Sequence, residues 1–110
     1  MSPNEYQEKA LRTENKDCKY PRIINGVLGL TGEAGECADM VKKAYYQGHD
    51  IGREHFAKEL GDVLWYIALC ADSQGYTLEE IMEMNIAKLT ARYPAGFNAD
   101  ESLHRKEGDV

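Results

Sequence analysis

The chain has 110 residues and a formal net charge of -6 at pH 7, without any Lys/Arg-rich run. These properties predict one domain and exclude a protein that binds nucleic acid polymers through a basic patch. The longest apolar run, 63–71, is far shorter than the roughly 20 residues that cross a bilayer, and residues 1–12 contain no apolar secretion signal. We therefore expect a soluble, cytoplasmic protein that does not bind membranes.

Hydrophobic spacing and capping residues predict four helices, at 4–15, 23–46, 53–74 and 77–93. Asn4 is the expected N-cap of the first helix. Gly75 is placed to end the third helix in a left-handed conformation. Thr77 and Glu80 have the spacing of a capping box at the start of the fourth helix, which must end before Pro94. The fold class is therefore all-α.

The second and third predicted helices differ in their apolar pattern, and only the third lacks the polar face expected of a helix on the outside of a small bundle. One stripe on the second helix contains Ile24, Val27, Leu28, Thr31, Ala34, Ala38 and Val41. The third helix is apolar almost all round between Val63 and Ala71. A second copy of the chain is the simplest source of the missing contacts, which predicts a homodimer or a dimer of dimers. The alternative is a central helix wrapped wholly by its own chain.

Three glycines, Gly29, Gly32 and Gly35, interrupt the second predicted helix. Each costs about 1 kcal/mol relative to alanine in a helix interior. Such a penalty predicts a close helix contact or the approach of a ligand at these positions. After Pro94 the sequence becomes polar, so we expect a domain at 1–97 and a polar, mobile tail at 98–110.

Two short acidic repeats lie within the apolar helical pattern. They are Glu33-Ala34-Gly35-Glu36 and Glu59-Leu60-Gly61-Asp62. Residues three apart on a helix share a face, and a short turn between the two helices brings both pairs to nearly the same level. Like charges about 4 Å apart repel by roughly 4 kcal/mol at an effective dielectric constant near 20. Four carboxylates together need either shared protons or a cation, and oxygen ligands favour Mg2+, with Mn2+ as a substitute.

The two acidic segments and the fourth predicted helix together resemble the MazG-like nucleoside triphosphate pyrophosphohydrolases, of the all-α NTP pyrophosphatase superfamily. The similar segments are 29–36, 58–66 and 85–94, within a resemblance that covers about residues 5–97. Two motifs agree in order and spacing, whereas a single Glu-x-x-Glu would be a weak signal. Some members have a further glutamate directly before the first pair, where this chain has Gly32. That departure leaves the number of metal ions open.

The resemblance implies Mg2+-dependent hydrolysis of a nucleoside or deoxynucleoside triphosphate to the monophosphate and pyrophosphate, in nucleotide-pool sanitation. It implies that Glu33, Glu36, Glu59 and Asp62 are the metal ligands and catalytic residues. It further implies that Asn85, Lys88 and Arg92, which share one helix face, bind the substrate. The alternative is a non-catalytic helical oligomer that binds or senses nucleotide through the same acidic site.

Overall fold

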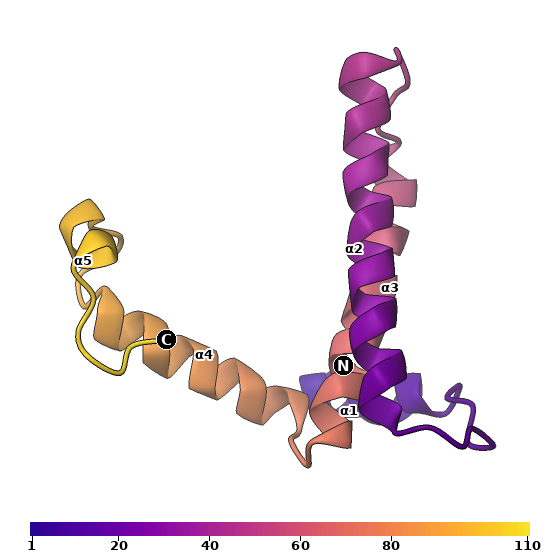
Figure 1. Ribbon diagram of the computed structural model, residues 1–110, viewed down its shortest axis with the longest axis horizontal. Helices are drawn as coiled ribbons and strands as arrows, with labels where there is room; N and C mark the ends of the chain where they lie inside the picture. Colours follow the sequence, from indigo (N-terminus) through magenta and orange to yellow (C-terminus); the bar gives the residue numbers. More distant parts are fainter. The chain divides into compact units, whose positions relative to one another are not determined.

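A computed structural model describes residues 1–110 as five α-helices without a β-strand, which confirms the all-α class (Figure 1). The helices are α1 (Pro3–Leu11), α2 (Arg22–Tyr46), α3 (Arg53–Ser73), α4 (Leu78–Arg92) and α5 (Ala99–Leu103). The chain divides into two compact units, Met1–Leu78 and Glu79–Val110. The first contains α1, α2 and α3, and the second contains most of α4 together with α5. None of the helices is long and apolar enough to cross a membrane.

The bounds of α2 and α3 agree with the sequence within one residue, and Gly75 has the expected positive φ of 80°. The first helix differs at both ends. Its N-cap is Ser2 rather than Asn4, because the Ser2 hydroxyl accepts a hydrogen bond from the Glu5 amide at 3.1 Å. Pro3 then takes the first turn, where its missing N–H costs nothing.

The first helix ends at Leu11, earlier than expected, because side chains take over the carbonyl of Ala10. The Thr13 hydroxyl donates to this oxygen at 2.8 Å, and Nε1 of Trp65 donates to it at 2.9 Å. Trp65 lies on α3, so the same bonds attach the end of α1 to α3. These bonds take the place of the helical bond that residue 14 would otherwise make to the same oxygen.

Helices α2 and α3 form an extended pair whose approach is closest at two glycines. A Cβ atom at Gly26 would lie 2.6 Å from Sγ of Cys70. A Cβ atom at Gly29 would lie 2.1 Å from the ring of Tyr66. The predicted close contact is therefore present at Gly29. At Gly32 and Gly35 a Cβ atom would meet nothing within 4 Å, so these glycines are not explained by packing within the chain.

The small core lies where α1, α3 and the start of α4 meet, and consists of Ala68, Leu69, Ala71 and Leu78. One buried polar side chain, Gln7, ties this region together. Its amide nitrogen donates to the carbonyls of Ala68 and Tyr76 at 3.2 and 3.1 Å, and its amide oxygen accepts from the Leu78 amide at 3.0 Å. All of these groups lie far from Gln7 in sequence, so one side chain fixes three segments.

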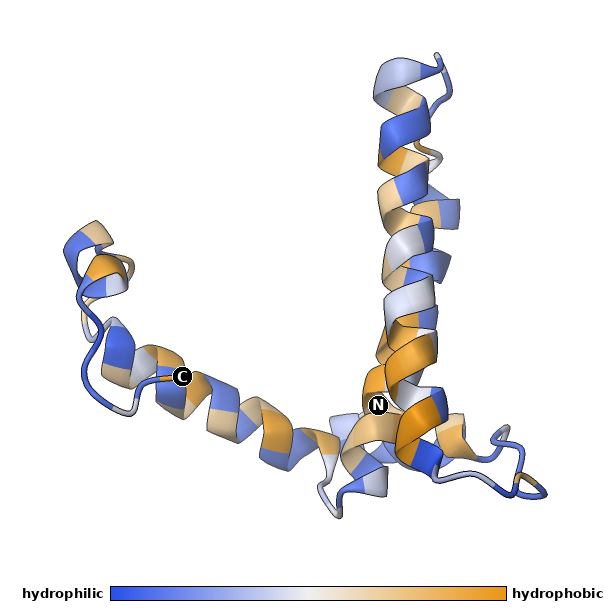
Figure 2. Cartoon of the chain, viewed as in Figure 1, coloured by the Kyte–Doolittle hydropathy of each residue, from blue (hydrophilic) through white to orange (hydrophobic).

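The predicted apolar stripe of α2 faces solvent in the single chain. All seven of its residues are exposed, with Leu28 at 68% and Ile24 at 47%. The face that α2 turns toward α3 instead carries Gly26, Gly29 and Glu33. Figure 2 shows that hydrophobic residues are concentrated in the N-terminal half of α2. The first unit thus has an apolar surface that its own helices leave open.

The second unit contains structure that the sequence analysis did not predict. Residues 98–110, predicted to be a polar tail, include α5 and a turn that returns to α4. Asn98 caps α5 by accepting from the amides of Asp100 and Glu101 at 2.9 and 3.1 Å. Asn98 and Glu101 have the spacing of a capping box, which is the signal that was overlooked.

The close packing at Gly29 generates a matched pair of substitutions. Gly29→Ala forces the Tyr66 ring away and is expected to destabilise the protein by about 1–3 kcal/mol. Gly32→Ala, on the same helix but in open space, is expected to stabilise it by up to about 1 kcal/mol through helix propensity. Urea denaturation followed by circular dichroism measures both. Equal effects of the two substitutions would contradict this account of the α2–α3 contact.

Candidate metal centre

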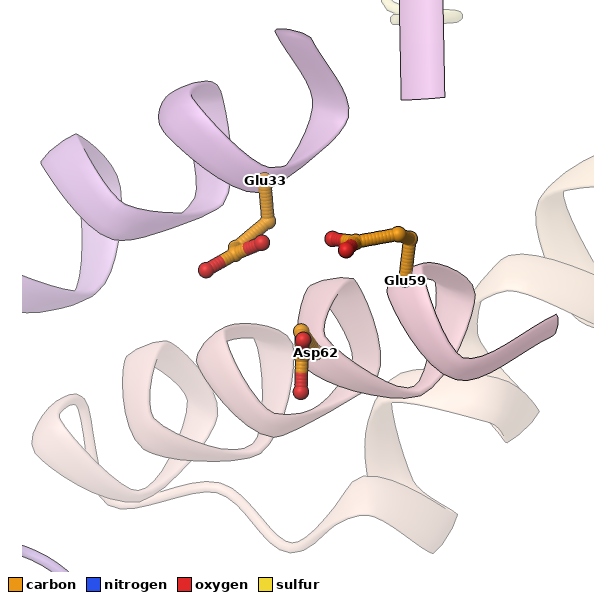
Figure 3. Close-up of side chains that lie close together, drawn as sticks. All are labelled: Glu33, Glu59 and Asp62. Atoms are coloured by element: carbon orange, nitrogen blue, oxygen red, sulfur yellow. The ribbon is translucent and has the colours of Figure 1, made fainter. Parts of the chain in front are cut away.

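Three of the four predicted ligand carboxylates converge between α2 and α3. Glu33 extends from α2 toward Glu59 and Asp62 of α3, as Figure 3 shows. One oxygen from each side chain lies within 4.8 Å of the others. Glu33 and Glu59 are half-buried, and Asp62 is exposed. We call these three residues the acidic cluster.

The geometry of the acidic cluster follows from the helix pair. Glu59 and Asp62 are three residues apart and so share one face of α3. Glu33 lies one turn after Gly29, the position at which α2 comes closest to α3. Because the Tyr66 ring fixes the level of α2 at Gly29, it also fixes the level at which Glu33 meets the two α3 carboxylates.

The surroundings of Glu33 disfavour its ionised form. Its pKa is raised by desolvation, by a hydrogen bond with Glu59, and by the negative charges of Asp62, Glu59 and Glu36. A carboxyl group with a raised pKa holds a proton more readily than usual. Glu59 alone among the three has a basic neighbour, Nε2 of His55 at 3.2 Å, and this contact is an ion pair only when the imidazole is protonated. The cluster is therefore poorly neutralised by the protein itself.

A cavity adjoins the acidic cluster on the side of α1. It measures ≈ 320 Å3 and is lined by Thr13, Glu33, Asp62, Trp65 and Tyr66. Trp65 is held there by its bonds to Ala10 and to the Thr13 hydroxyl, the latter at 3.0 Å. The carboxylates thus open onto a space that has an aromatic wall.

The fourth predicted ligand, Glu36, lies outside the acidic cluster. It is exposed on α2, one turn after Glu33, and its oxygens are not among those that converge. Its charge still contributes to the raised pKa of Glu33. Glu36 therefore belongs to the same electrostatic neighbourhood, and its role as a ligand stays a prediction.

The three predicted substrate-binding residues lie in the second unit. Asn85 and Lys88 are exposed on α4. Arg92, at the end of α4, is bonded to Asp109: its Nε donates to Oδ2 at 2.8 Å and its Nη2 donates to Oδ1 at 2.7 Å. The sequence analysis missed Asp109 because nothing in a local pattern links it to Arg92.

His55 is a further residue whose place beside the site was not predicted. Its side chain is 66% exposed, yet its ring bonds to Glu59. The spacing of four residues between them on a helix is the signal that could have indicated this contact. Lys58, in contrast, pairs with Glu54 at 3.5 Å, away from the cluster.

The donor set of the acidic cluster fits a hard divalent cation. All its ligand atoms are carboxylate oxygens, which Mg2+ and Mn2+ prefer to nitrogen or sulfur. A cation would also offset the desolvation and the neighbouring negative charges that raise the pKa of Glu33. The cysteines take no part in the cluster, and all three are free thiols.

The raised pKa of Glu33 gives a test on the metal-free protein. Between the unfolded pKa, about 4.3, and the higher folded pKa, the folded state binds more protons, so stability falls as pH rises through this window. Glu33→Gln removes the repelling charge and is expected to raise the melting temperature at pH 7 in EDTA. The gain should disappear as pH falls below about 4. Glu36→Gln, outside the cluster, should give a smaller gain.

Comparison with known proteins identifies the group to which this helical chain belongs. The chain is 37% identical over 73 residues to the Gene 37 protein of Mycobacterium phage L5, covering 63% of this chain and 64% of the phage protein. It is 36% identical over 74 residues to the uncharacterized protein YvdC of Bacillus subtilis (strain 168), covering 58% of this chain and 69% of that protein.

The chain thus spans less than two thirds of the phage protein's own length. No solved structure matches it. Residues 25–97, which contain both acidic repeats and the whole of α4, match the MazG nucleotide pyrophosphohydrolase domain. The chain belongs to the MazG nucleotide pyrophosphohydrolase domain family.

Proposed function

We propose that the chain hydrolyses a nucleoside or deoxynucleoside triphosphate to the monophosphate and pyrophosphate, with Mg2+, in nucleotide-pool sanitation. Family membership supports a nucleotide pyrophosphohydrolase. The observation that carries the metal-dependent form of this proposal is the convergence of Glu33, Glu59 and Asp62 between two helices. Residues 1–97 form the proposed catalytic domain.

Charge explains why the proposed reaction needs a cation. A triphosphate is an anion and is repelled by the bare carboxylates of the acidic cluster. When bound, Mg2+ would supply positive charge that attracts phosphate oxygens and stabilises the leaving pyrophosphate. Glu33, Glu59 and Asp62 would hold it, with Glu36 as a fourth proposed ligand one turn away on α2. Mn2+ is the proposed substitute because it shares the preference for oxygen.

The same carboxylates can also act on a proton. Glu36 is the proposed general base, because it is exposed to water and lies one turn from the cluster. Desolvation and its acidic neighbours favour the protonated form of Glu33, which makes Glu33 the less suitable base. The protein's contribution is therefore to separate the roles of neighbouring carboxylates by their surroundings.

Substrate positioning is assigned to α4 in this proposal. Asn85 offers an amide, and Lys88 and Arg92 offer positive charge, on one face of that helix. A guanidinium group matches a phosphate by donating two parallel hydrogen bonds, whereas an ammonium group acts as a point charge. We therefore propose that Arg92 orients the phosphate groups of the substrate and that Lys88 attracts them through its charge.

A panel of ribonucleoside and deoxynucleoside triphosphates with Mg2+, assayed for pyrophosphate release, tests the proposed activity. Glu59→Gln and Asp62→Asn are each expected to lower turnover by at least about a hundredfold, because each removes a proposed ligand and a charge from the cluster. Circular dichroism should show unchanged helix content in both variants.

Glu54→Gln is the matched control, since Glu54 lies on the same helix but pairs with Lys58 outside the cluster. It should retain wild-type turnover. Unchanged rates in both cluster variants would remove these residues from the mechanism. Nucleotide binding without turnover of any triphosphate would instead favour the non-catalytic, nucleotide-sensing alternative.

We also propose that the chain assembles as a homodimer or homotetramer, through the open apolar face of α2. This face contains Ile24, Val27, Leu28, Thr31, Ala34, Ala38 and Val41, all exposed in the single chain. A contiguous apolar face of this kind is typical of a protein–protein contact. A second copy is the favoured occupant because the first unit has few fully buried hydrophobic side chains of its own.

Leu28→Glu tests this assembly, because Leu28 is the most exposed of the large hydrophobic side chains on this face of α2 and the substitution places a charge there. It is expected to shift the protein toward the monomer, as measured by light scattering after size-exclusion chromatography. Leu103→Glu, at a similarly exposed leucine of α5, is the matched control and should leave the assembly intact. A wild-type monomer at all concentrations would contradict the proposal.

A further inference from the structure

A two-point ion pair in the second unit joins α4 to the C-terminal segment. Arg92 donates from both Nε and Nη2 to the two carboxylate oxygens of Asp109. The side chains of Arg92 and Asp109 are only 10% and 15% exposed. Parallel, two-point pairing of this kind is stronger and more directional than the common exposed ion pair.

The local backbone delivers Asp109 to this position. The amide of Asp109 donates to the carbonyl of Lys106 at 3.1 Å, which closes a turn. Gly108, within that turn, has a φ of 84°, a left-handed conformation that glycine adopts without strain. The turn directs the Asp109 side chain back toward α4 instead of into solvent.

The pair lies in a cavity lined by charges of both signs. The cavity measures ≈ 450 Å3, and its walls carry four basic side chains, Lys88, Arg92, Arg105 and Lys106, and three acidic ones, Glu101, Glu107 and Asp109. The pKa of Asp109 is lowered chiefly by its hydrogen bond with Arg92, with further contributions from the charges of Arg92, Arg105 and Lys88. Three cationic side chains therefore act on one carboxylate.

We propose that Asp109 is an internal competitor of the substrate, whose carboxylate occupies Arg92 until an anionic phosphate group displaces it. The inference rests on the proposed function in one respect, the assignment of Arg92 to phosphate binding. Asp109 already occupies the Nε–Nη2 edge of Arg92, so a phosphate group that takes two hydrogen bonds from that edge has to displace it.

Competition of this kind lowers apparent affinity without changing the contacts that the bound anion makes. The apparent dissociation constant rises in inverse proportion to the fraction of molecules in which Arg92 is released. Once Asp109 is displaced, the four basic side chains of the cavity outnumber its two remaining acidic ones, so a phosphate group, which carries more charge than Asp109, gains more from this lining. Weakly charged anions therefore leave Asp109 bound to Arg92, whereas strongly charged anions displace it.

Binding of inorganic pyrophosphate in metal-free buffer, measured by calorimetry, tests the proposal. Without a cation the acidic cluster repels this anion, so the measurement reports on α4. Asp109→Asn is compared with Glu107→Gln, which removes the same charge from the same segment but leaves the Arg92 pair intact. We expect Asp109→Asn to bind pyrophosphate about three- to tenfold more tightly than Glu107→Gln does.

A double-variant cycle shows whether the gain passes through Arg92. In an Arg92→Lys background, Asp109→Asn should give no further gain over Glu107→Gln, because the two-point pair is already lost. Hydrogen exchange gives a second readout: pyrophosphate should accelerate exchange at the backbone amide of Asp109 in the wild-type protein.

Equal affinity of the Asp109→Asn and Glu107→Gln variants would overturn the inference, as would a failure of pyrophosphate to bind any variant. These outcomes are independent of turnover. If the wild-type protein releases pyrophosphate from a triphosphate but Asp109→Asn does not change pyrophosphate affinity, the proposed competition is wrong and the proposed enzymatic activity stands. If Asp109→Asn binds pyrophosphate more tightly but the protein turns over no triphosphate, the proposed activity is wrong and the competition stands.

Discussion

The close packing of α2 on α3 at Gly26 and Gly29 is the constraint on which the candidate site depends. With no side chain at Gly29, the Tyr66 ring lies directly against the backbone of α2. Glu33 follows one helical turn later and meets Glu59 and Asp62. A change of level between the two helices would move Glu33 along α3 and disperse the carboxylates. The geometry of the acidic cluster is thus set by the contact between a glycine and a tyrosine ring one turn away.

The acidic cluster works against the stability of the protein that contains it. Desolvation and neighbouring charges raise the pKa of Glu33, which means that the ionised cluster costs free energy when no cation is bound. Burial elsewhere in the first unit has to offset this cost, and its core is small. The Gln7 amide helps, because its three hydrogen bonds join α1 to α3 and to the start of α4. Functional sites typically contain locally unfavourable arrangements, such as clustered carboxylates, that favourable interactions elsewhere in the protein offset.

Sequence periodicity was sufficient to predict α2, α3 and the meeting of Glu33 with Glu59 and Asp62, because all of these follow from helical spacing across one short turn. It did not predict which face of α2 packs within the chain. The apolar stripe suggested one face, but the closest contact uses glycines on another, since glycine allows backbones to approach. The Arg92–Asp109 pair was missed because residues 17 apart are brought together by a turn rather than by a repeating pattern.

The tight fit between the two long helices also encloses a thiol. Sγ of Cys70 lies against Gly26, and burial raises the pKa of Cys70, so little of the reactive thiolate is present while the hairpin is closed. Cys18, on the exposed connection before α2, has no such protection. A thiol reagent would therefore label the exposed Cys18 faster than the half-buried Cys70. The labelling rate of Cys70 would therefore report on how tightly α2 packs against α3, the helix pair that holds the carboxylates.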